Sequence, residues 1–291
     1  MDVIDTLLTR GVDKVYPTKE KLEETLRSGK KLRLYQGFDP TGSQLHIGHA
    51  VGLRKMRQFQ DLGHHVIFLI GDFTGMIGDP SGKSSERKVL TREQVLENAA
   101  SYKEQASRIL RFDGENPVEI KYNSEWLGKM SAAEFIGLSH HLTAAQVMER
   151  DMFQERNKKG QDVYMNEFLY PFMQGYDSVA MDVDLEIGGS DQMFNMMMGR
   201  KLMHNIKQKE KFVITMKLLE DSSGKKMGKT ENNAVSMLDN EFEMFGKVMS
   251  WTDGMILPAF DIWCQTPCLF QHAARLTTYQ VYIVLCIPGN A

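Results

Sequence analysis

The sequence has few cysteines and no long apolar run. Cys264, Cys268 and Cys286 are the only three among 291 residues, and an odd number confined to one end argues against a disulfide framework. A zinc site needs about four ligands, and although His272 would make a fourth, the spacing fits no familiar zinc pattern. No stretch reaches the ~20 apolar residues of a membrane span. The start, MDVIDTLLTR, has no cleavable apolar core. We therefore expect a cytoplasmic protein with no metal site and no membrane contact.

The sequence also lacks a strong charge of either sign. Lysine and arginine number 35 against 38 aspartates and glutamates, so the net charge is -3, and 42% of the residues are hydrophobic. This is the profile of a soluble globular protein, and it excludes RNA binding through a broad basic surface. RNA contact would need a local patch, although such charge runs are usually solvated helix faces. The candidate patch is Arg200, Lys201, His204, Lys207, Lys209 and Lys211.

Predicted strands alternate with predicted helices along the chain. The apolar run at 65–71 is typical of a strand buried on both faces of a parallel sheet. Further strands are expected at 32–38, 118–122, 183–187 and 212–216. Helices are expected at 19–28, 46–62, 92–111, from Ser131 on, 143–156, 164–176 and 191–204. The alternation predicts a doubly wound parallel α/β sheet, which binds ligands at the carboxyl ends of its strands.

The first chemical motif is His46-Ile47-Gly48-His49, at a predicted strand–loop–helix junction. Two imidazoles three residues apart share one helix face. The free N–H groups and the positive dipole end of the helix point the same way, so the pair suits an anion such as an ATP phosphate. A lone pair of histidines at this spacing is a weak signal, because surface or core histidines show it too.

Two lysine-bearing stretches, GDPSGKSSER and KKMGKT, resemble phosphate loops. Neither is a Walker A motif, because Ile77 and Ser223 stand where that motif needs glycine. Lys83 and Arg87 remain candidate phosphate contacts. Several lysines in the second stretch suit a triphosphate whose charge must be neutralised, although an exposed basic turn would have the same composition.

Polar residues also follow a stripe on one predicted helix. Tyr170, Gln174 and Asp177 are spaced i, i+4 and i+7, where a core helix would place apolar residues. After the strand at 183–187 comes GGSDQ, whose glycines permit close approach of a ligand to the backbone. Asp191 at the following helix start suits either ribose hydroxyls or a helix cap.

Together these motifs resemble class I aminoacyl-tRNA synthetases, which carry HIGH early and a KMGKT-like motif late. More narrowly, YQGFDPTGSQLHIGH, GDPSGKSSER, YPFMQGYD and GGSDQ resemble bacterial tyrosyl-tRNA synthetases, over roughly residues 1–260. The resemblance implies a Rossmann-like catalytic domain at 1–217 with a helical insertion at about 128–165. A mobile KMGKT loop and the start of a helical linker would follow at 218–260.

The resemblance also implies the reaction. The carboxylate of L-tyrosine would attack the α-phosphorus of ATP, which brings Mg²⁺ with it, and tyrosyl-adenylate would then pass its tyrosyl group to tRNA(Tyr). Tyr35 and Asp177 would bind the phenol, and a site built for that hydroxyl rejects phenylalanine strongly. A homodimer is implied as well, with its interface around the insertion.

Residue roles are carried over by motif in three overlapping sets. The tyrosine contacts are Tyr35, Asp79, Tyr170, Gln174, Asp177 and Gln192. The ATP contacts are Gly37, Asp39, His46, His49, Gly189, Asp191, Lys226 and Lys229. The catalytic contacts to the phosphates are His46, His49, Thr41, Lys226, Lys229, Thr230, Lys83 and Arg87. None of these side chains is a covalent nucleophile in the implied mechanism.

The resemblance fades after about Phe260. Residues 261–291 contain all three cysteines and have few charges, whereas family members continue with an anticodon-recognition region and a small S4-like domain. We expect this tail to be atypical, from a frameshift, a truncated gene or a misassigned terminus, and the tRNA step to be impaired. Three alternatives stay open: a tryptophanyl-tRNA synthetase-like enzyme, an inactive synthetase-derived RNA-binding fragment, and another nucleotidyltransferase with a HIGH motif.

Overall fold

One sheet organises the fold. The structure, a computed structural model, describes residues 2–81, 90–220 and 235–263, and within them six strands pair in the order β1-β6-β5-β2-β3-β4. The strands are β1 (Val12–Tyr16), β2 (Arg33–Phe38), β3 (His65–Ile70), β4 (Glu119–Tyr122), β5 (Leu185–Gly189) and β6 (Phe212–Met216). All pairs are parallel except the edge pair of β1 and β6. The predicted doubly wound sheet is therefore confirmed, with an antiparallel edge strand added.

The strand order changes direction at β2. From β2 the chain adds β3 and then β4 on one side, and it later returns to place β5 and β6 on the other side. This change of direction puts a topological switch point between the carboxyl ends of β2 and β5, where sheets of this kind bind ligands.

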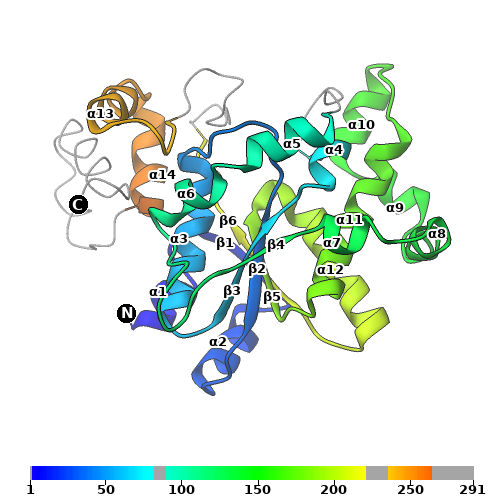
Figure 1. The fold of residues 1–291 in the computed structure, drawn as a ribbon, viewed down its shortest axis with the longest axis horizontal. Coiled ribbons are helices and arrows are strands. Elements are labelled where there is room, and N and C mark those ends of the chain that lie inside the picture. Colours follow the sequence, from blue (N-terminus) through cyan, green and yellow to red (C-terminus); the bar gives the residue numbers. More distant parts are fainter. Residues whose placement is uncertain (1, 82–89, 221–234, 264–291) are drawn as a thin grey trace.

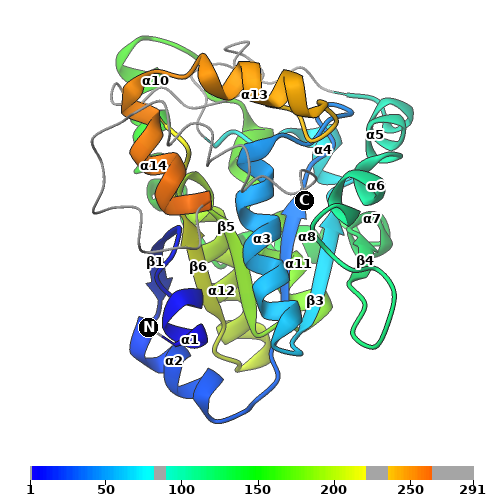
Figure 2. The same cartoon turned by 90° about the vertical axis from the view of Figure 1, so that its left-hand side faces the viewer.

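Helices cover both faces of the sheet (Figure 1). α3 (Ile47–Asp61) lies on one face, and α11 (Met165–Met181) and α12 (Met193–Lys207) lie on the other, as the turned view in Figure 2 shows. β3 is buried between the two layers, as predicted. Its side chains alternate, so that Val66, Phe68 and Ile70 pack in the cluster that includes α3, and Ile67 and Leu69 pack on the opposite face.

The remaining helices are short. They are α1 (Val3–Leu7), α2 (Lys19–Arg27), α4 (Thr74–Ile77), α5 (Arg92–Ala99), α6 (Tyr102–Ser107), α7 (Ser124–Leu127), α8 (Ala132–Ser139), α9 (Ala144–Met148), α10 (Asp151–Lys158), η1 (Ser190–Gln192), α13 (Glu241–Met249) and α14 (Asp253–Trp263). The α8–α10 segment lies at one end of the molecule, and α13 and α14 lie at the other (Figure 1). No helix among the described residues is long and apolar enough to cross a membrane.

Two predicted helices are interrupted in the structure. The helix expected at 92–111 breaks at Ser101, whose hydroxyl donates to the Ser43 carbonyl at 3.1 Å. The helix expected at 143–156 breaks at Arg150, whose ψ of 128° is extended and whose guanidinium donates to Ser81 Oγ at 3.0 Å. In both places a tertiary hydrogen bond outweighs helical propensity.

Two other boundaries also differ from the expectation. The strand expected at 183–187 runs instead from Leu185 to Gly189, because Asp182 is left-handed (φ 48°) and ends α11. The helix expected at 164–176 continues to Met181. α1 and β1, of five residues each, were not predicted. α13 and most of α14 lie in the stretch 218–260, where the resemblance implied the start of a helical linker.

Candidate active site

The two histidines of the HIGH motif sit at the start of α3. His46 Nδ1 accepts from the Gly48 N–H at 3.1 Å, and His49 Nδ1 accepts from the His46 N–H at 3.1 Å. The rings lie 3.9 Å apart between centroids. Because each Nδ1 acts as an acceptor, the proton of each neutral ring is on Nε2. The pair therefore caps α3 and presents two N–H donors at a helix N-terminus.

The chain that follows the KMGKT stretch returns to this helix start. The Ile47 N–H donates to the Val235 carbonyl at 2.9 Å, and the Met237 N–H donates to the Leu45 carbonyl at 2.9 Å. Residues 235–237, far from the HIGH motif in sequence, thus lie beside the N-terminus of α3. Lys226, Lys229 and Thr230, like Lys83 and Arg87, lie outside the described residues, as do the three cysteines.

Asp39, directly after β2, accepts hydrogen bonds from α4 and α11. Its Oδ1 accepts from the Thr74 hydroxyl and its Oδ2 from the Tyr170 hydroxyl, both at 2.7 Å. Gly71 after β3 makes this possible, because a Cβ there would lie 2.0 Å from Asp39 Oδ1. Thr41, two residues on, is exposed, and its N–H donates to the Asp39 carbonyl.

Asp79 and Gln192 are brought together from positions 113 residues apart. Gln192 Nε2 donates to Asp79 Oδ2 at 2.7 Å, while Asn195 donates to Asp79 Oδ1 at 3.3 Å. Asn195 also bonds Gln192 and Ser81, so this small network joins the segment after α4 to the start of α12. Asn195 belongs to none of the sequence motifs.

Gly37 and Gly189 lie near the carboxyl ends of β2 and β5, on the two strands that flank the switch point. A Cβ on Gly189 would lie 2.6 Å from Asp191 Oδ1 and 2.9 Å from Leu218. Any larger residue at 189 would therefore displace Asp191, which the sequence predicts to contact the nucleotide. The structure brings these three residues to the same edge as Asp39 and His46.

Asp177 is buried on the sheet-facing side of α11. Its carboxylate accepts from Trp126 Nε1 at 2.8 Å and from Asn123 Nδ2 at 3.4 Å. Burial raises its pKa well above the usual value, and these two hydrogen bonds oppose that shift. Neither Trp126 nor Asn123 was predicted as a site residue, because neither belongs to a motif.

Tyr35 on β2 is completely buried, with its hydroxyl 2.9 Å from Ser178 Oγ. Burial, with the negative charges of Glu186 and Asp177, raises the pKa of this phenol well above its usual value, so Tyr35 is neutral. Tyr35 and Asp177 thus have different protein partners, and their shared contact with a substrate phenol stays a prediction.

A buried ion pair lies beneath these residues, and the sequence did not predict it. Lys211 Nζ bonds Glu186 Oε2, and it also donates to Ser178 Oγ at 2.7 Å and to the Met196 carbonyl at 3.3 Å. Gln174 Nε2 donates to the other Glu186 oxygen at 3.1 Å. Burial lowers the pKa of Lys211, and the Glu186 charge opposes that shift. The one available signal was a glutamate inside the apolar strand LEIGG.

The proposed basic patch is therefore wrong for Lys211, which is fully buried rather than solvated. Arg200 pairs with Glu210, and Lys209 pairs with Asp184 at 3.1 Å. These acidic partners reduce the positive charge that an RNA backbone would meet.

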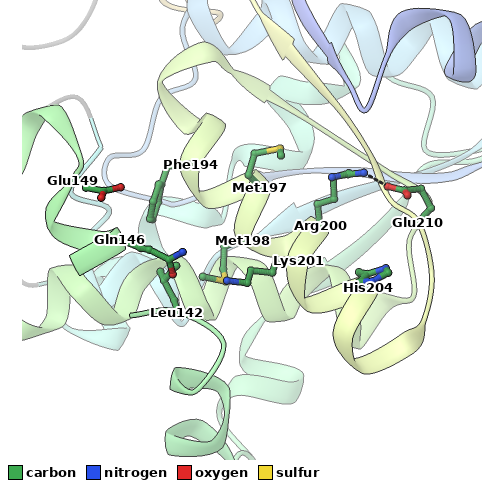
Figure 3. Close-up of a pocket in the computed structure, with 10 residues that line it drawn as sticks. All are labelled: Leu142, Gln146, Glu149, Phe194, Met197, Met198, Arg200, Lys201, His204 and Glu210. Carbon is green, nitrogen blue, oxygen red and sulfur yellow. Dashed lines mark hydrogen bonds and ion pairs between the residues drawn. The ribbon is translucent and has the colours of Figure 1, made fainter. Parts of the chain in front are cut away.

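A separate groove of about 600 Å³ lies between α12 and the α8–α10 segment (Figure 3). Leu142, Phe194 and Met198 supply apolar lining, and Glu149 and Lys201 add charge. None of the residues predicted for tyrosine or ATP lines this groove.

The candidate active site is the polar cluster at the carboxyl ends of β2, β3 and β5. Among the described residues, no group of three or more histidine, cysteine or carboxylate side chains is placed to hold a metal ion.

Comparison with known proteins identifies the family. The model of a family described as tRNA synthetases class I (W and Y) matches residues 27–269. The chain belongs to this family. It is 49% identical over 260 residues to a protein of Geobacter metallireducens named Tyrosine–tRNA ligase, covering 88% of this chain and 64% of the relative. A Shewanella oneidensis protein of the same name is 48% identical over 265 residues, covering 90% and 65%. The chain thus spans just under two thirds of these synthetases.

Solved structures support the synthetase fold. A C-terminally truncated mitochondrial tyrosyl-tRNA synthetase from Coccidioides posadasii superposes with a TM-score of 0.77 at 22% identity, covering all of this chain and 89% of that one. A tyrosyl-tRNA synthetase from Archaeoglobus fulgidus, solved with L-tyrosine, gives 0.72 at 23% identity, covering 90% and 80%. At these identities the likeness concerns the fold alone.

Proposed function

We propose that this chain activates L-tyrosine with ATP to form tyrosyl-adenylate, and that transfer to the 3′ end of tRNA(Tyr) completes the reaction of a tyrosine–tRNA ligase. The observation that carries the proposal is the buried polar group at Asp177, held by Trp126 beside the switch point. A buried carboxylate at this depth suits a ligand that brings a hydroxyl to it, as tyrosine does. The names of the relatives support tyrosine over tryptophan.

The chemistry is an in-line displacement at the α-phosphorus: an oxygen of the tyrosine carboxylate forms the new P–O bond as the bond to the β-phosphate oxygen breaks and pyrophosphate leaves. ATP enters as its magnesium complex. The Nε2–H groups of His46 and His49, with the N-terminus of α3, donate to the phosphate oxygens as charge develops there. We propose six further phosphate contacts: Thr41, Lys83, Arg87, Lys226, Lys229 and Thr230. Positioning and charge stabilisation supply the rate, because no side chain forms a covalent intermediate.

Binding of the two substrates follows from the same cluster. We assign the tyrosine ammonium group to Asp79, Tyr170 and Gln174, and the phenol to Tyr35 and Asp177. We assign Gln192 to a position near the carboxylate of the tyrosine substrate. The nucleotide contacts are assigned to Gly37, Asp39, Gly189 and Asp191, all at or just after the ends of β2 and β5. In this assignment tyrosine lies over the switch point and ATP lies toward α3.

The domain arrangement and the assembly state belong to the same proposal. Residues 1–217 form the catalytic domain, 128–165 the helical insertion and 218–260 the loop and linker, in a cytoplasmic homodimer. Exposed apolar side chains on and next to the insertion support the dimer interface there: Ile136 is 61% exposed and Met165 is 71% exposed.

The test is ATP–pyrophosphate exchange by the 291-residue chain with tyrosine, tryptophan or phenylalanine as the amino acid. We expect exchange with tyrosine, and a preference over phenylalanine of about 10⁴–10⁵. Faster exchange with tryptophan would instead support the tryptophanyl alternative. No exchange with any of the three would support an inactive fragment.

A further inference from the structure

The ion pair of Lys211 and Glu186 lies directly behind the residues assigned to tyrosine. We propose that it is a positioning device for the substrate ammonium group, because it fixes the Gln174 amide with its carbonyl oxygen turned toward the substrate. This inference rests on the proposed function and deepens it. It assigns roles to two residues that belong to none of the sequence motifs.

Every N–H donor of the Lys211 ammonium group has a hydrogen-bond acceptor. An ammonium group has three N–H donors, and Lys211 Nζ has three acceptors: Glu186 Oε2, Ser178 Oγ and the Met196 carbonyl. A neutral amine has only two N–H groups, so it would leave its lone pair facing one of these acceptors. The geometry therefore suits the charged lysine paired with a charged glutamate.

The glutamate in turn dictates the orientation of Gln174. An ionised carboxylate only accepts hydrogen bonds, so the amide must present its NH₂ group to Glu186, as the 3.1 Å contact from Nε2 shows. The carbonyl oxygen Oε1 then points away from Glu186. The structure records no hydrogen bond to this oxygen from the residues that it describes. A carbonyl oxygen is the end of the amide that accepts from an ammonium group.

The surrounding fold holds the pair in place. Glu186 is paired in register with Tyr35 across β5 and β2, so the pair lies under the assigned phenol site as well. Gly199 on α12 leaves room for the lysine, since a Cβ there would lie 2.5 Å from Lys211 Nζ. Any larger side chain at 199 would push the ammonium group away from Glu186.

A purely structural role is the competing explanation. Two apolar residues of similar size often give equal or greater stability than a buried ion pair. Stability alone therefore does not require these charges, whereas a fixed orientation of the Gln174 amide does. The two explanations differ in which ligands they affect.

The test compares three ligands that differ in one group each: tyrosine, tyramine, which lacks the carboxylate, and 3-(4-hydroxyphenyl)propanoate, which lacks the ammonium. Dissociation constants are measured by calorimetry for the unmodified chain, Glu186→Gln and the double variant Lys211→Met/Glu186→Gln. Glutamine at 186 accepts or donates, so it releases the constraint on Gln174. The double variant removes both charges together, which leaves no unpaired buried charge if a single variant fails to fold.

We expect tyrosine and tyramine to bind about 10- to 100-fold more weakly to both variants, the range for a hydrogen bond to a charged group. Binding of the propanoate should change less than about threefold. Equal weakening of all three ligands, or no weakening of any, would overturn the proposal. If the unmodified chain binds neither tyrosine nor tyramine, the proposed function itself fails, before any variant is compared.

Two further variants sharpen the result. Lys209→Met is the matched control, because it removes the ion pairs of Lys209 with Asp182 and Asp184, two residues from Lys211, without touching Gln174. It should bind all three ligands like the unmodified chain. Gln174→Leu removes the group through which Glu186 is proposed to act. In that background Glu186→Gln should have no further effect on the preference for ammonium-bearing ligands, and an additive effect would contradict the proposal.

Discussion

His64, just before β3, is a buried titratable side chain outside the candidate active site. Its Nδ1 accepts from the Leu32 N–H at 3.0 Å, and burial lowers its pKa to about 4 from 6.5. In the interval between these values the unfolded chain binds more protons than the folded one. Stability is therefore fully present above pH 6.5 and is lost as the pH falls toward 4.

We expect the histidine to account for a loss of about 3 kcal/mol in the free energy of unfolding between pH 7 and pH 4. His64→Asn keeps a hydrogen-bond acceptor near Leu32 but does not titrate. Urea denaturation at several pH values should show a flatter profile for this variant. An identical profile for both proteins would contradict the assignment.

Trp126 supplies the shortest hydrogen bond to Asp177, at 2.8 Å, and Asn123 the longer one at 3.4 Å. Trp126→Phe keeps most of the ring packing but removes this donor. We expect the KM for tyrosine to rise about tenfold in pyrophosphate exchange, because one charge-assisted hydrogen bond that fixes the carboxylate is lost. The KM for ATP should not change, and a rise in both constants would show a general disturbance of the site.

At the scale of elements, we propose that His46 at the start of α3 has both a structural and a catalytic role. His46 caps the helix through Nδ1 and presents Nε2 to the assigned phosphate site. His46→Ser separates the roles, because serine is a good N-cap without the imidazole donor.

We expect His46→Ser to lower kcat for exchange about 100-fold, the usual effect of losing one donor to a developing charge. Its stability should fall by less than about 1 kcal/mol, while His46→Ala, which loses the cap too, should be less stable than the serine variant. Thermal melts and exchange rates of the two variants provide the measurement. Full activity in His46→Ser would exclude the phosphate role.

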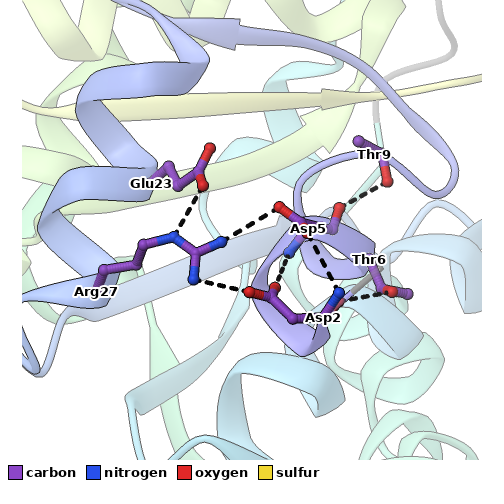
Figure 4. A network of polar contacts seen from close by, with 6 residues as sticks. All are labelled: Asp2, Asp5, Thr6, Thr9, Glu23 and Arg27. Atoms are coloured by element: carbon purple, nitrogen blue, oxygen red, sulfur yellow. Dashed lines mark hydrogen bonds and ion pairs between the residues drawn. The ribbon is translucent and has the colours of Figure 1, made fainter.

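The N-terminal helices α1 and α2 are connected by exposed ion pairs. Arg27 on α2 pairs with Asp2, the N-cap of α1, at 2.7 Å and with Asp5 in α1 at 3.2 Å (Figure 4). It also pairs with Glu23 in its own helix at 2.8 Å. The bond to Arg27 lowers the pKa of Asp2. These groups are exposed and screened by salt, so the network orients α1 and adds little to stability.

The sequence predicted the elements whose pattern is local. β3, β6 and α3 were found from an apolar run or a helical period, and Tyr170, Gln174 and Asp177 lie on one helix, α11, as expected. Their contact with a substrate stays a prediction. The breaks at Ser101 and Arg150 were not predictable, because each depends on a partner about 60 or 70 residues away. The Lys211–Glu186 pair was also missed because it joins a residue of β5 to the residue just before β6. No local pattern shows that one lysine of a basic cluster is buried.

At the scale of the molecule, the α8–α10 segment and α13 mark opposite ends (Figure 1). Both carry exposed apolar side chains, Ile136 on α8 at 61% and Phe242 on α13 at 88%. The proposed dimer uses the first end only. We therefore expect Ile136→Glu to shift the chain from dimer to monomer in sedimentation, because a charge in an apolar interface is strongly unfavourable.

Phe242→Glu is the matched control for that experiment. It replaces an apolar and more exposed side chain by the same charged residue, at the far end of the molecule. It should leave the association state unchanged. If Phe242→Glu dissociates the dimer and Ile136→Glu does not, the interface lies at the α13 end.

The switch point has a consequence for the order of folding. β2 and β5 pair although Leu34 and Leu185 are about 150 residues apart, and Asp79 and Gln192, which share a hydrogen bond, are 113 residues apart. Contacts of such long sequence separation form late, because the chain must first close a large loop. During synthesis the histidines emerge from the ribosome long before the later residues that we assign to the amino-acid site. Binding competence should therefore appear in the slowest phase of refolding, after most helices have formed.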